Sequence, residues 1–292
     1  MILVTAANGN QGRLLVPRLL AAGIAFRACV RSDSSAKILR AAGVTDLVVG
    51  DIVEPAVLAR AMQGVEKVYH VGPTLHPKER ELGFAAIDAA RAAGVKHFVF
   101  SSVLHAITTD LVQHEIKRDI EEYLLSSGLE FTILQPSNYM LPMRLRPAFE
   151  NGVFHLSWAL DRYQSPVDLG DVTEVAAAVL INSGDHTGAT YELVAPGRYT
   201  AYDLAKVISD VMGREIRPER VDPDIFIKQF LKIDDLSQFP YQVRAARAIS
   251  ARYSSHDFIG NSNVLTWLLG RQPTTFGQFV RKQFDAFGAV PR

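Results

Sequence analysis

The chain has 292 residues, of which 48% are hydrophobic and 21% are charged, and these are the proportions of an ordinary globular protein. Its 31 basic and 31 acidic side chains balance, which argues against nucleic acid or an anionic membrane surface as a partner. The single cysteine, Cys29, excludes an internal disulfide and a cysteine-based zinc site, and we expect it to be buried in an apolar strand.

No basic leader precedes the first apolar run, and no apolar stretch is long enough to cross a bilayer. We therefore expect a cytoplasmic protein without a membrane partner. The eight histidines show no spacing typical of metal ligands, so no metal site is predicted.

Short apolar runs alternate with helical patterns through the first half of the sequence, and glycines follow many of the helices. The expected strands are residues 2–5, 26–30, 47–50, 68–71, 97–101 and 131–134. The expected helices are residues 11–22, 35–42, 55–63, 81–93 and 115–126. This alternation predicts an α/β fold, a Rossmann-like doubly wound parallel sheet with helices on both faces.

The second half of the sequence is less regular. Residues 188–194 are predicted to form another strand, and residues 200–212 a helix that begins after Thr200 and ends at Gly213. Helical pieces beyond this point predict a smaller, mostly α C-terminal lobe that covers a substrate at the carboxyl ends of the strands. We expect a dinucleotide-binding domain in residues 1–150, rejoined by about residues 165–195, and the substrate lobe in residues 196–292.

The loop between the first strand and the first helix carries the first functional signal. Gly9 and Gly12 keep the spacing of a Gly-x-x-Gly-x-x-Gly run in which Ala6 replaces the first glycine. Such a loop lets a pyrophosphate approach the backbone and the free N–H groups of the first helical turn. A turn without a ligand is the alternative, and the strand–loop–helix context favours nucleotide binding. The expected contacts are Thr5, Ala7, Asn8, Gly9, Asn10, Gln11 and Gly12.

The end of the second strand indicates which dinucleotide binds. A carboxylate there binds the ribose hydroxyls of NAD, whereas a cation pairs with the additional phosphate of NADP. Arg31 and Ser32 occupy this position and Lys37 follows, which predicts NADP(H) in preference to NAD(H). The alternative for Arg31 is a solvated arginine on the surface. If the end of the second strand is shifted relative to the cofactor, Asp33 would place a carboxylate near the ribose instead.

The next two strand ends fit the same site. Asp51 can meet the adenine amino group and Ile52 can stack on the ring, while Gly72, between Val71 and Pro73, leaves room for the ribose and pyrophosphate. Each segment alone is typical of a helix cap or a turn. Together, at the ends of consecutive strands, they favour the dinucleotide site.

Three segments resemble the NmrA-like branch of the atypical short-chain dehydrogenases/reductases: the loop at residues 5–12, the Arg31–Ser32 pair, and residues 114–136. The third is the most specific, with a helix that ends in Ser-Ser-Gly and a strand that ends in Gln-Pro. Residues 165–172 and the alanine-rich sequence after them resemble the segment where extended relatives return to the core.

The resemblance implies a Rossmann fold, an NAD(P)(H) site and a small α-rich substrate lobe. It does not fix an activity, because the family includes quinone, enone and ether reductases as well as non-catalytic redox sensors. Within the motifs that match, Ser101, Lys117 and Pro136 are added to the expected cofactor contacts.

The catalytic motif of the wider superfamily is incomplete in this sequence. Typical members use a serine at the fifth strand and a Tyr-x-x-x-Lys pair on the next helix, in which the tyrosine passes a proton. Lys117 occupies the lysine position, but Gln113 stands four residues before it, and an amide cannot act as the acid. Ser102 and Lys117 are the expected catalytic residues, with a solvated Lys117 as the alternative.

A second Tyr-x-x-x-Lys match occurs at Tyr202 and Lys206, in the expected outer lobe. We interpret it as coincidental, with Tyr202 packed and Lys206 solvated.

Without the tyrosine, the site suits acceptors that need little help with protonation. The predicted function is an NADPH-dependent oxidoreductase that passes hydride to a small apolar quinone, enone or carbonyl compound. Tyr139, Met140 and Trp158 are expected to line the substrate pocket, with ordinary lobe core as the alternative. A non-catalytic NADP(H) sensor that acts through a protein partner is the second hypothesis, and either a monomer or a homodimer is expected.

Overall fold

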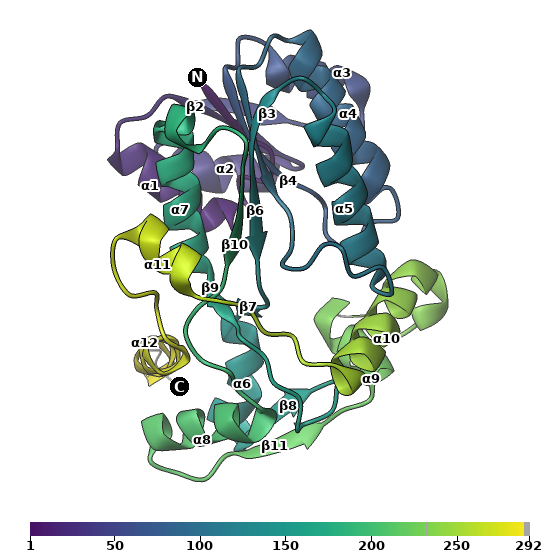
Figure 1. Cartoon of the computed structure of the whole chain (residues 1–292), viewed down its shortest axis with the longest axis vertical. Helices are drawn as coiled ribbons and strands as arrows, with labels where there is room; N and C mark the ends of the chain where they lie inside the picture. The colour runs from purple at the N-terminus through teal and green to yellow at the C-terminus, as the bar shows by residue number, and fades with distance from the viewer. Residues whose placement is uncertain (232, 289–292) are drawn as a thin grey trace. The chain divides into compact units, whose positions relative to one another are not determined.

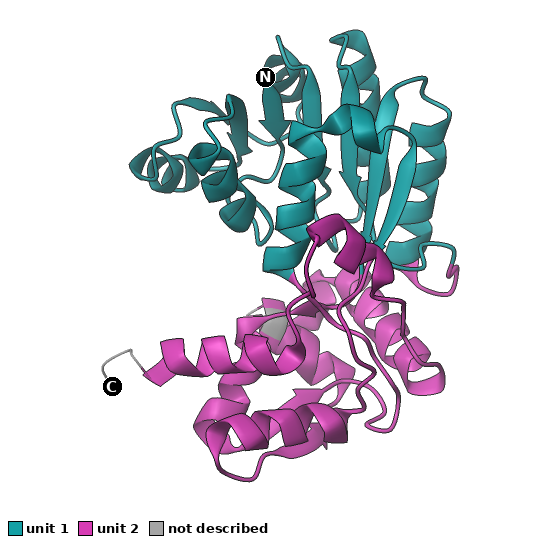
Figure 2. Cartoon of the chain, turned by 60° about the vertical axis from the view of Figure 1, so that its left-hand side comes forward, with its two compact units in different colours: residues 1–107, 113–136, 169–192 teal, residues 108–112, 137–168, 193–292 magenta. Residues whose placement is uncertain are grey.

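The computed structural model describes residues 1–231 and 233–288, and the chain divides into two compact units (Figure 2). Unit 1 comprises residues 1–107, 113–136 and 169–192, and unit 2 comprises residues 108–112, 137–168 and 193–292. The boundary expected at residue 150 therefore falls inside unit 2, because the chain leaves unit 1 where its sixth strand ends at Pro136.

Unit 1 is built on a seven-stranded sheet in the order β10-β6-β5-β4-β1-β2-β3. Its strands are β1 (Ile2–Val4), β2 (Phe26–Val30), β3 (Asp46–Val49), β4 (Lys67–Val71), β5 (His97–Ser101), β6 (Glu130–Pro136) and β10 (Ala189–Leu193). The pairs from β3 across to β6 are all parallel, which confirms the predicted Rossmann-like sheet. The strand order reverses between β1 and β4, and open α/β sheets bind ligands at such a reversal, beyond the carboxyl ends of the strands.

Helices cover both faces of this sheet (Figure 1). One face carries α1 (Gly12–Ala21), α2 (Asp33–Ala41) and α7 (Leu169–Ile181), and the other carries α3 (Pro55–Met62), α4 (Glu79–Ala92) and α5 (Val112–Leu125). The expected helices and strands of this half agree with the structure to within a few residues. Leu3, Val68 and Phe98 are fully buried, as expected for strands that pack against helices on both sides.

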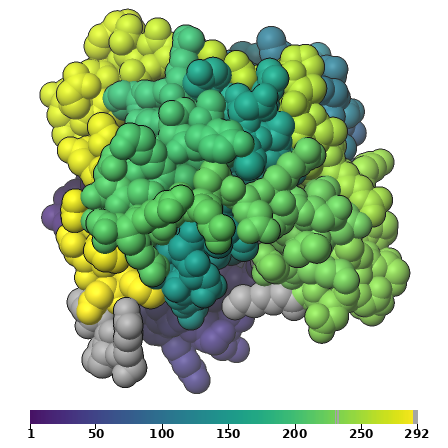
Figure 3. Space-filling model, turned by 90° about the horizontal axis from the view of Figure 1, so that it is seen from below, coloured from purple at the N-terminus to yellow at the C-terminus, as the bar shows by residue number. Residues whose placement is uncertain are grey.

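Unit 2 is mostly helical. Figure 3 shows part of its surface, with its later residues in green and yellow. Its helices are α6 (Pro142–Asn151), α8 (Ala201–Met212), α9 (Pro223–Leu231), α10 (Pro240–Ser255), α11 (Asn263–Leu269) and α12 (Phe276–Gly288). Two short parallel pairs join β8 (Val153–Leu156) to β11 (Arg217–Arg220) and β7 (Tyr139–Met140) to β9 (Val167–Asp168). Within the described residues, no helix combines the length and apolar character that crossing a bilayer requires.

Candidate cofactor site and active site

A cavity of about 660 Å³ lies in unit 1 where β1, β2, β3 and β4 end. This volume is typical of a site for a small molecule or cofactor. Ten of the residues expected to bind the cofactor line it: Thr5, Asn8, Gly9, Arg31, Ser32, Asp51, Ile52, Val71, Gly72 and Pro73. The lining also includes residues that the sequence analysis did not single out as contacts: Ala6, Arg13, Cys29, Val30, Ser35, Gly50, Val53 and His76.

The glycine loop owes its shape to Gly12. A Cβ atom at this position would overlap the backbone carbonyl oxygens of Ala6 and Ala7, so α1 can approach the loop only through a glycine. Gly9 N donates a hydrogen bond of 2.9 Å to Ala6 O and closes the turn. Ala6 itself does not adopt a positive φ, which explains physically why alanine can replace the first glycine of the motif.

Replacing Gly12 with alanine is expected to cost about 1–3 kcal/mol of stability, because the overlap forces the loop and α1 apart. Chemical denaturation of the purified variant measures this loss. Gly184→Ala is the matched control, since a Cβ there meets no atom within 4 Å and the backbone is not left-handed. Equal stability of the Gly12→Ala variant and the parent protein would contradict the packing described for the loop.

The loop is tied to the start of α2 through Asn8. Arg13 Nε donates to Asn8 O at 2.9 Å, and Asn8 Nδ2 donates to Ser35 Oγ at 2.8 Å. Ser32 caps α2 by accepting a hydrogen bond from Ser35 N. These bonds fix the wall of the cavity that carries Arg31.

The remaining expected cofactor contacts do not line this cavity. Ala7, Gln11 and Gly12 are buried, and Gln11 Nε2 donates to Ser101 Oγ at 2.8 Å. Asn10 and Lys37 are exposed. Asp33, the carboxylate that could have lain near the ribose instead of Arg31, is also exposed.

Lys117 is held in a buried ion pair rather than in solvent. Its Nζ lies 2.7 Å from Glu79 Oε1, and the two side chains are 10% and 1% exposed, respectively. The same ammonium group donates to Ser101 O at 3.4 Å and lies 5.0 Å from the centre of the Phe100 ring. The solvated alternative for Lys117 is therefore wrong.

Gly72 makes room for this ion pair at the end of β4. A Cβ there would lie 2.8 Å from Glu79 Oε1 and 3.3 Å from Lys117 Nζ. Glu79 was not identified from the sequence, because an acidic residue in the first turn of a helix is ordinarily interpreted as a partner of the helix dipole.

Two further ionisable groups near the strand ends are neutral. Burial, and then the charge of Lys117, lower the pKa of His70 to about 3, while its Nδ1 lies 3.3 Å from Thr5 Oγ1. Burial raises the pKa of the Cys29 thiol to about 11. Cys29 is buried as expected, and its raised pKa disfavours the reactive thiolate.

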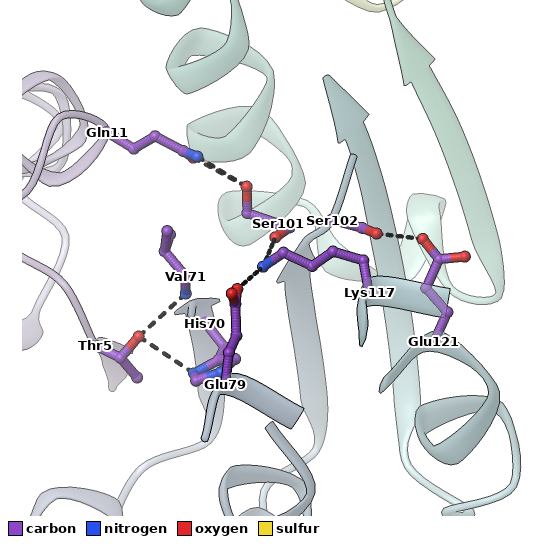
Figure 4. A network of polar contacts seen from close by, with 9 residues as sticks. All are labelled: Thr5, Gln11, His70, Val71, Glu79, Ser101, Ser102, Lys117 and Glu121. Carbon is purple, nitrogen blue, oxygen red and sulfur yellow. Dashed lines mark hydrogen bonds and ion pairs between the residues drawn. The ribbon is translucent and has the colours of Figure 1, made fainter. Parts of the chain in front are cut away.

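The expected catalytic serine lies in a separate polar cluster (Figure 4). Ser102 Oγ donates a hydrogen bond to Glu121 Oε1. Gln135 Nε2 donates to both oxygens of the same carboxylate, at 2.9 and 3.0 Å. Burial raises the pKa of Glu121 above its ordinary value, against the opposing effects of these hydrogen bonds and of Lys117.

Gln113, at the position of the missing tyrosine, and Pro136, at the end of β6, both belong to unit 1. Gln113 lies in α5, which begins at Val112 and not at the expected residue 115, and its Oε1 is buried without a hydrogen-bond partner among the described residues. Pro136 is buried, and its carbonyl oxygen accepts a hydrogen bond of 2.9 Å from Leu104 N.

The expected substrate residues lie in unit 2. Tyr139 and Met140 line a cavity of about 30 Å³, which holds no more than about one water molecule. Trp158 is buried and packs edge-on against Tyr253, with ring centres 5.3 Å apart. Their role in binding a substrate stays a prediction.

The second Tyr-x-x-x-Lys match lies on the surface of α8. Tyr202 is 57% exposed, so the expectation that it packs was wrong. Lys206 is exposed, as expected, and pairs with Asp210 at 3.1 Å. The helical spacing places Leu204, Ala205 and Ile208 on the buried face and leaves Tyr202 outside it. Within the described residues, no group of three or more His, Cys, Asp or Glu side chains could hold a metal ion.

The parallel sheet with its glycine loop at the end of β1 defines a Rossmann-like α/β protein. The sequence profile of the NmrA-like family matches residues 1–264, so the chain belongs to this family, as the resemblance predicted.

Similar proteins include reductases that match the chain over nearly its whole length. The chain is 30% identical over 298 residues to an NAD(P)H azoreductase from Xenophilus azovorans, covering 99% of this chain and 100% of the relative. It is 28% identical over 291 residues to quinone oxidoreductase 2 from Escherichia coli, covering 98% and 99%. A crystal structure of an NADPH-dependent quinone oxidoreductase from Escherichia coli, complexed with NADPH, is similar with a TM-score of 0.81 at 27% identity, covering 97% and 100%.

Proposed function

We propose that this protein is an NADPH-dependent reductase that transfers hydride to a small apolar acceptor, a quinone, enone or related carbonyl compound. The observation that carries the proposal is the cavity at the ends of β1 to β4, which the glycine loop and the Arg31–Ser32 pair line together. The names of the similar azoreductase and quinone oxidoreductase support the same reaction class.

The preference for NADP(H) rests on the end of β2. The Arg31 guanidinium and the Ser32 hydroxyl are the donors that a ribose phosphate needs, and both residues line the cavity. The cavity also includes Asp51 and Ile52, which we assign to the adenine ring. The neighbouring Asp33 is not part of the lining, which supports Arg31 and Ser32, rather than a carboxylate, as the groups near the ribose.

Lys117 is proposed to orient the nicotinamide ribose by donating hydrogen bonds to its hydroxyls. The ion pair with Glu79 keeps the ammonium group at the end of β4, next to Gly72 in the cavity wall. When bound, NADPH supplies the hydride. Because Gln113 replaces the tyrosine acid, quinones are the favoured acceptors, since their reduced anions can also take a proton from water.

Mixing the protein with NADPH and a panel of quinones, enones and azo dyes tests this function. We expect NADPH absorbance to decay with the quinones, and to decay more slowly when NADH replaces NADPH at low concentration. Absorbance that stays unchanged across the panel, with NADPH bound, would contradict the proposal. That result would favour a non-catalytic NADP(H) sensor that acts through a protein partner.

A further inference from the structure

We propose that Ser102 and Glu121 form a proton relay that protonates the reduced acceptor in place of the missing tyrosine. This inference rests on the proposed function, because it concerns the proton that accompanies hydride transfer. Ser102 is the donor to the acceptor, and Glu121 acts through Ser102.

The relay is built from three elements of unit 1. Ser102 directly follows β5, is 5% exposed, and is fixed by a backbone hydrogen bond of 2.8 Å from its N to Leu134 O. Glu121 lies one helical turn after Lys117, so both side chains project from one face of α5. Gln135 of β6 holds both carboxylate oxygens of Glu121. The carboxylate is therefore oriented toward the serine hydroxyl (Figure 4).

A short series of contacts connects this relay with the cofactor cavity. Gly72 lies in the cavity wall beside the Glu79–Lys117 pair, and Lys117 Nζ donates to the carbonyl oxygen of Ser101. Ser102 is the next residue along the chain. Ser102, the proposed proton donor, therefore directly follows the residue whose carbonyl oxygen accepts a hydrogen bond from Lys117.

The protonation state of Glu121 decides where the Ser102 hydroxyl points. When Glu121 is ionised, Ser102 donates its hydrogen to the carboxylate, as in the structure, and has none to offer an acceptor. When Glu121 is protonated, its own O–H can donate to Ser102 Oγ, which frees the serine hydrogen. The active form of the relay is thus the protonated one.

The surroundings of Glu121 shift its titration toward this form. Burial raises its pKa, which increases the protonated fraction at any given pH. Lys117, on the same helix, acts in the opposite direction, but its charge is compensated by Glu79 of α4. The two groups bonded directly to the carboxylate, Ser102 beyond β5 and Gln135 of β6, are uncharged.

The proton balance is simple. Hydride addition to a quinone gives a hydroquinone monoanion. The Ser102 O–H bond breaks as its proton moves to the anionic oxygen, and the proton of Glu121 moves to Ser102 Oγ. Glu121 is left as a carboxylate and regains a proton from solvent. The sum is quinone, NADPH and one proton giving hydroquinone and NADP⁺.

The test compares the parent protein with Glu121→Gln and Ser102→Ala over a pH range, using benzoquinones whose hydroquinones differ in acidity. Glu121→Gln keeps the size of the side chain and an oxygen that can accept from Ser102. We expect kcat to fall by about 100-fold for quinones that give weakly acidic hydroquinones, the usual contribution of a general acid. The loss should be small for quinones that give strongly acidic hydroquinones, because their anions need no proton in the rate-limiting step.

The pH profile separates a relay from a structural role. In the parent protein, kcat should fall as pH rises through the pKa of Glu121, and this limb should be absent in Glu121→Gln. Glu122→Gln is the matched control, because Glu122 is the next residue of α5 and is exposed. Ser102→Ala changes no charged side chain and should reproduce the dependence on hydroquinone acidity. Agreement between the two variants guards against a folding defect in one of them.

An active parent protein whose rate and pH profile do not change in Glu121→Gln would overturn the relay while the reductase function stands. A parent protein that binds NADPH but reduces none of the quinones would overturn both.

Discussion

Replacing Glu79 with alanine is expected to destabilise the protein by about 3–5 kcal/mol, because Lys117 would remain as an unpaired buried charge. Glu79 is almost completely buried, and the charged group that it faces is the Lys117 ammonium at 2.7 Å. Chemical denaturation, with the free energy of unfolding extrapolated to water, measures the loss.

Two controls identify the cause. The double variant Glu79→Leu, Lys117→Met removes both charges and should recover most of the stability, since a buried ion pair is often no better than apolar residues of similar volume. Asp210→Ala breaks the exposed pair with Lys206 and should change stability little. A Glu79→Ala variant as stable as the parent protein would mean that Lys117 reaches water without its partner.

Replacing Arg31 with alanine is expected to weaken NADPH binding by about 10- to 100-fold, equivalent to about 1.5–3 kcal/mol for hydrogen bonds to a charged group. NADH binding should stay the same, because NADH has no phosphate for the guanidinium to meet. Calorimetric titration of both nucleotides into the parent protein and the variant measures the difference.

Arg40→Ala is the matched control for this substitution. Arg40 is an exposed arginine in the last turn of α2 and is not part of the cavity wall. Its removal changes the net charge by the same amount without changing the proposed phosphate contact. Equal affinities of the parent protein for NADPH and NADH would contradict the assignment of the cofactor.

The sheet and much of the cavity wall were predictable because local sequence determines both. Glycines end many of the helices, and the strands are short apolar runs. The alternation of strands and helices can therefore be predicted without knowledge of the tertiary structure. Parallel strands bring their carboxyl ends to one edge of the sheet, which is why Thr5, Arg31, Asp51 and Gly72 could be grouped from their positions at strand ends.

Other parts of the site depend on packing between elements far apart in sequence. Glu79 meets Lys117 only because α4 and α5 pack on the same face of the sheet, and nothing in the local sequence around either residue indicates the pair. Glu121 is similar, since its partners are Ser102, the residue after β5, and Gln135 of β6. The short strands in residues 137–168 have too few residues to show a periodic pattern, and α6 contains two prolines that obscure its helical character.

A single-turnover experiment tests hydride transfer most directly. The protein is loaded with NADPH that carries deuterium on one of the two C4 positions and is then mixed rapidly with a benzoquinone. We expect NADPH absorbance to decay with formation of one hydroquinone per NADPH, and deuterium on the transferred position to slow the decay several-fold. Bound NADPH whose absorbance persists in the presence of the quinone would contradict the reductase function.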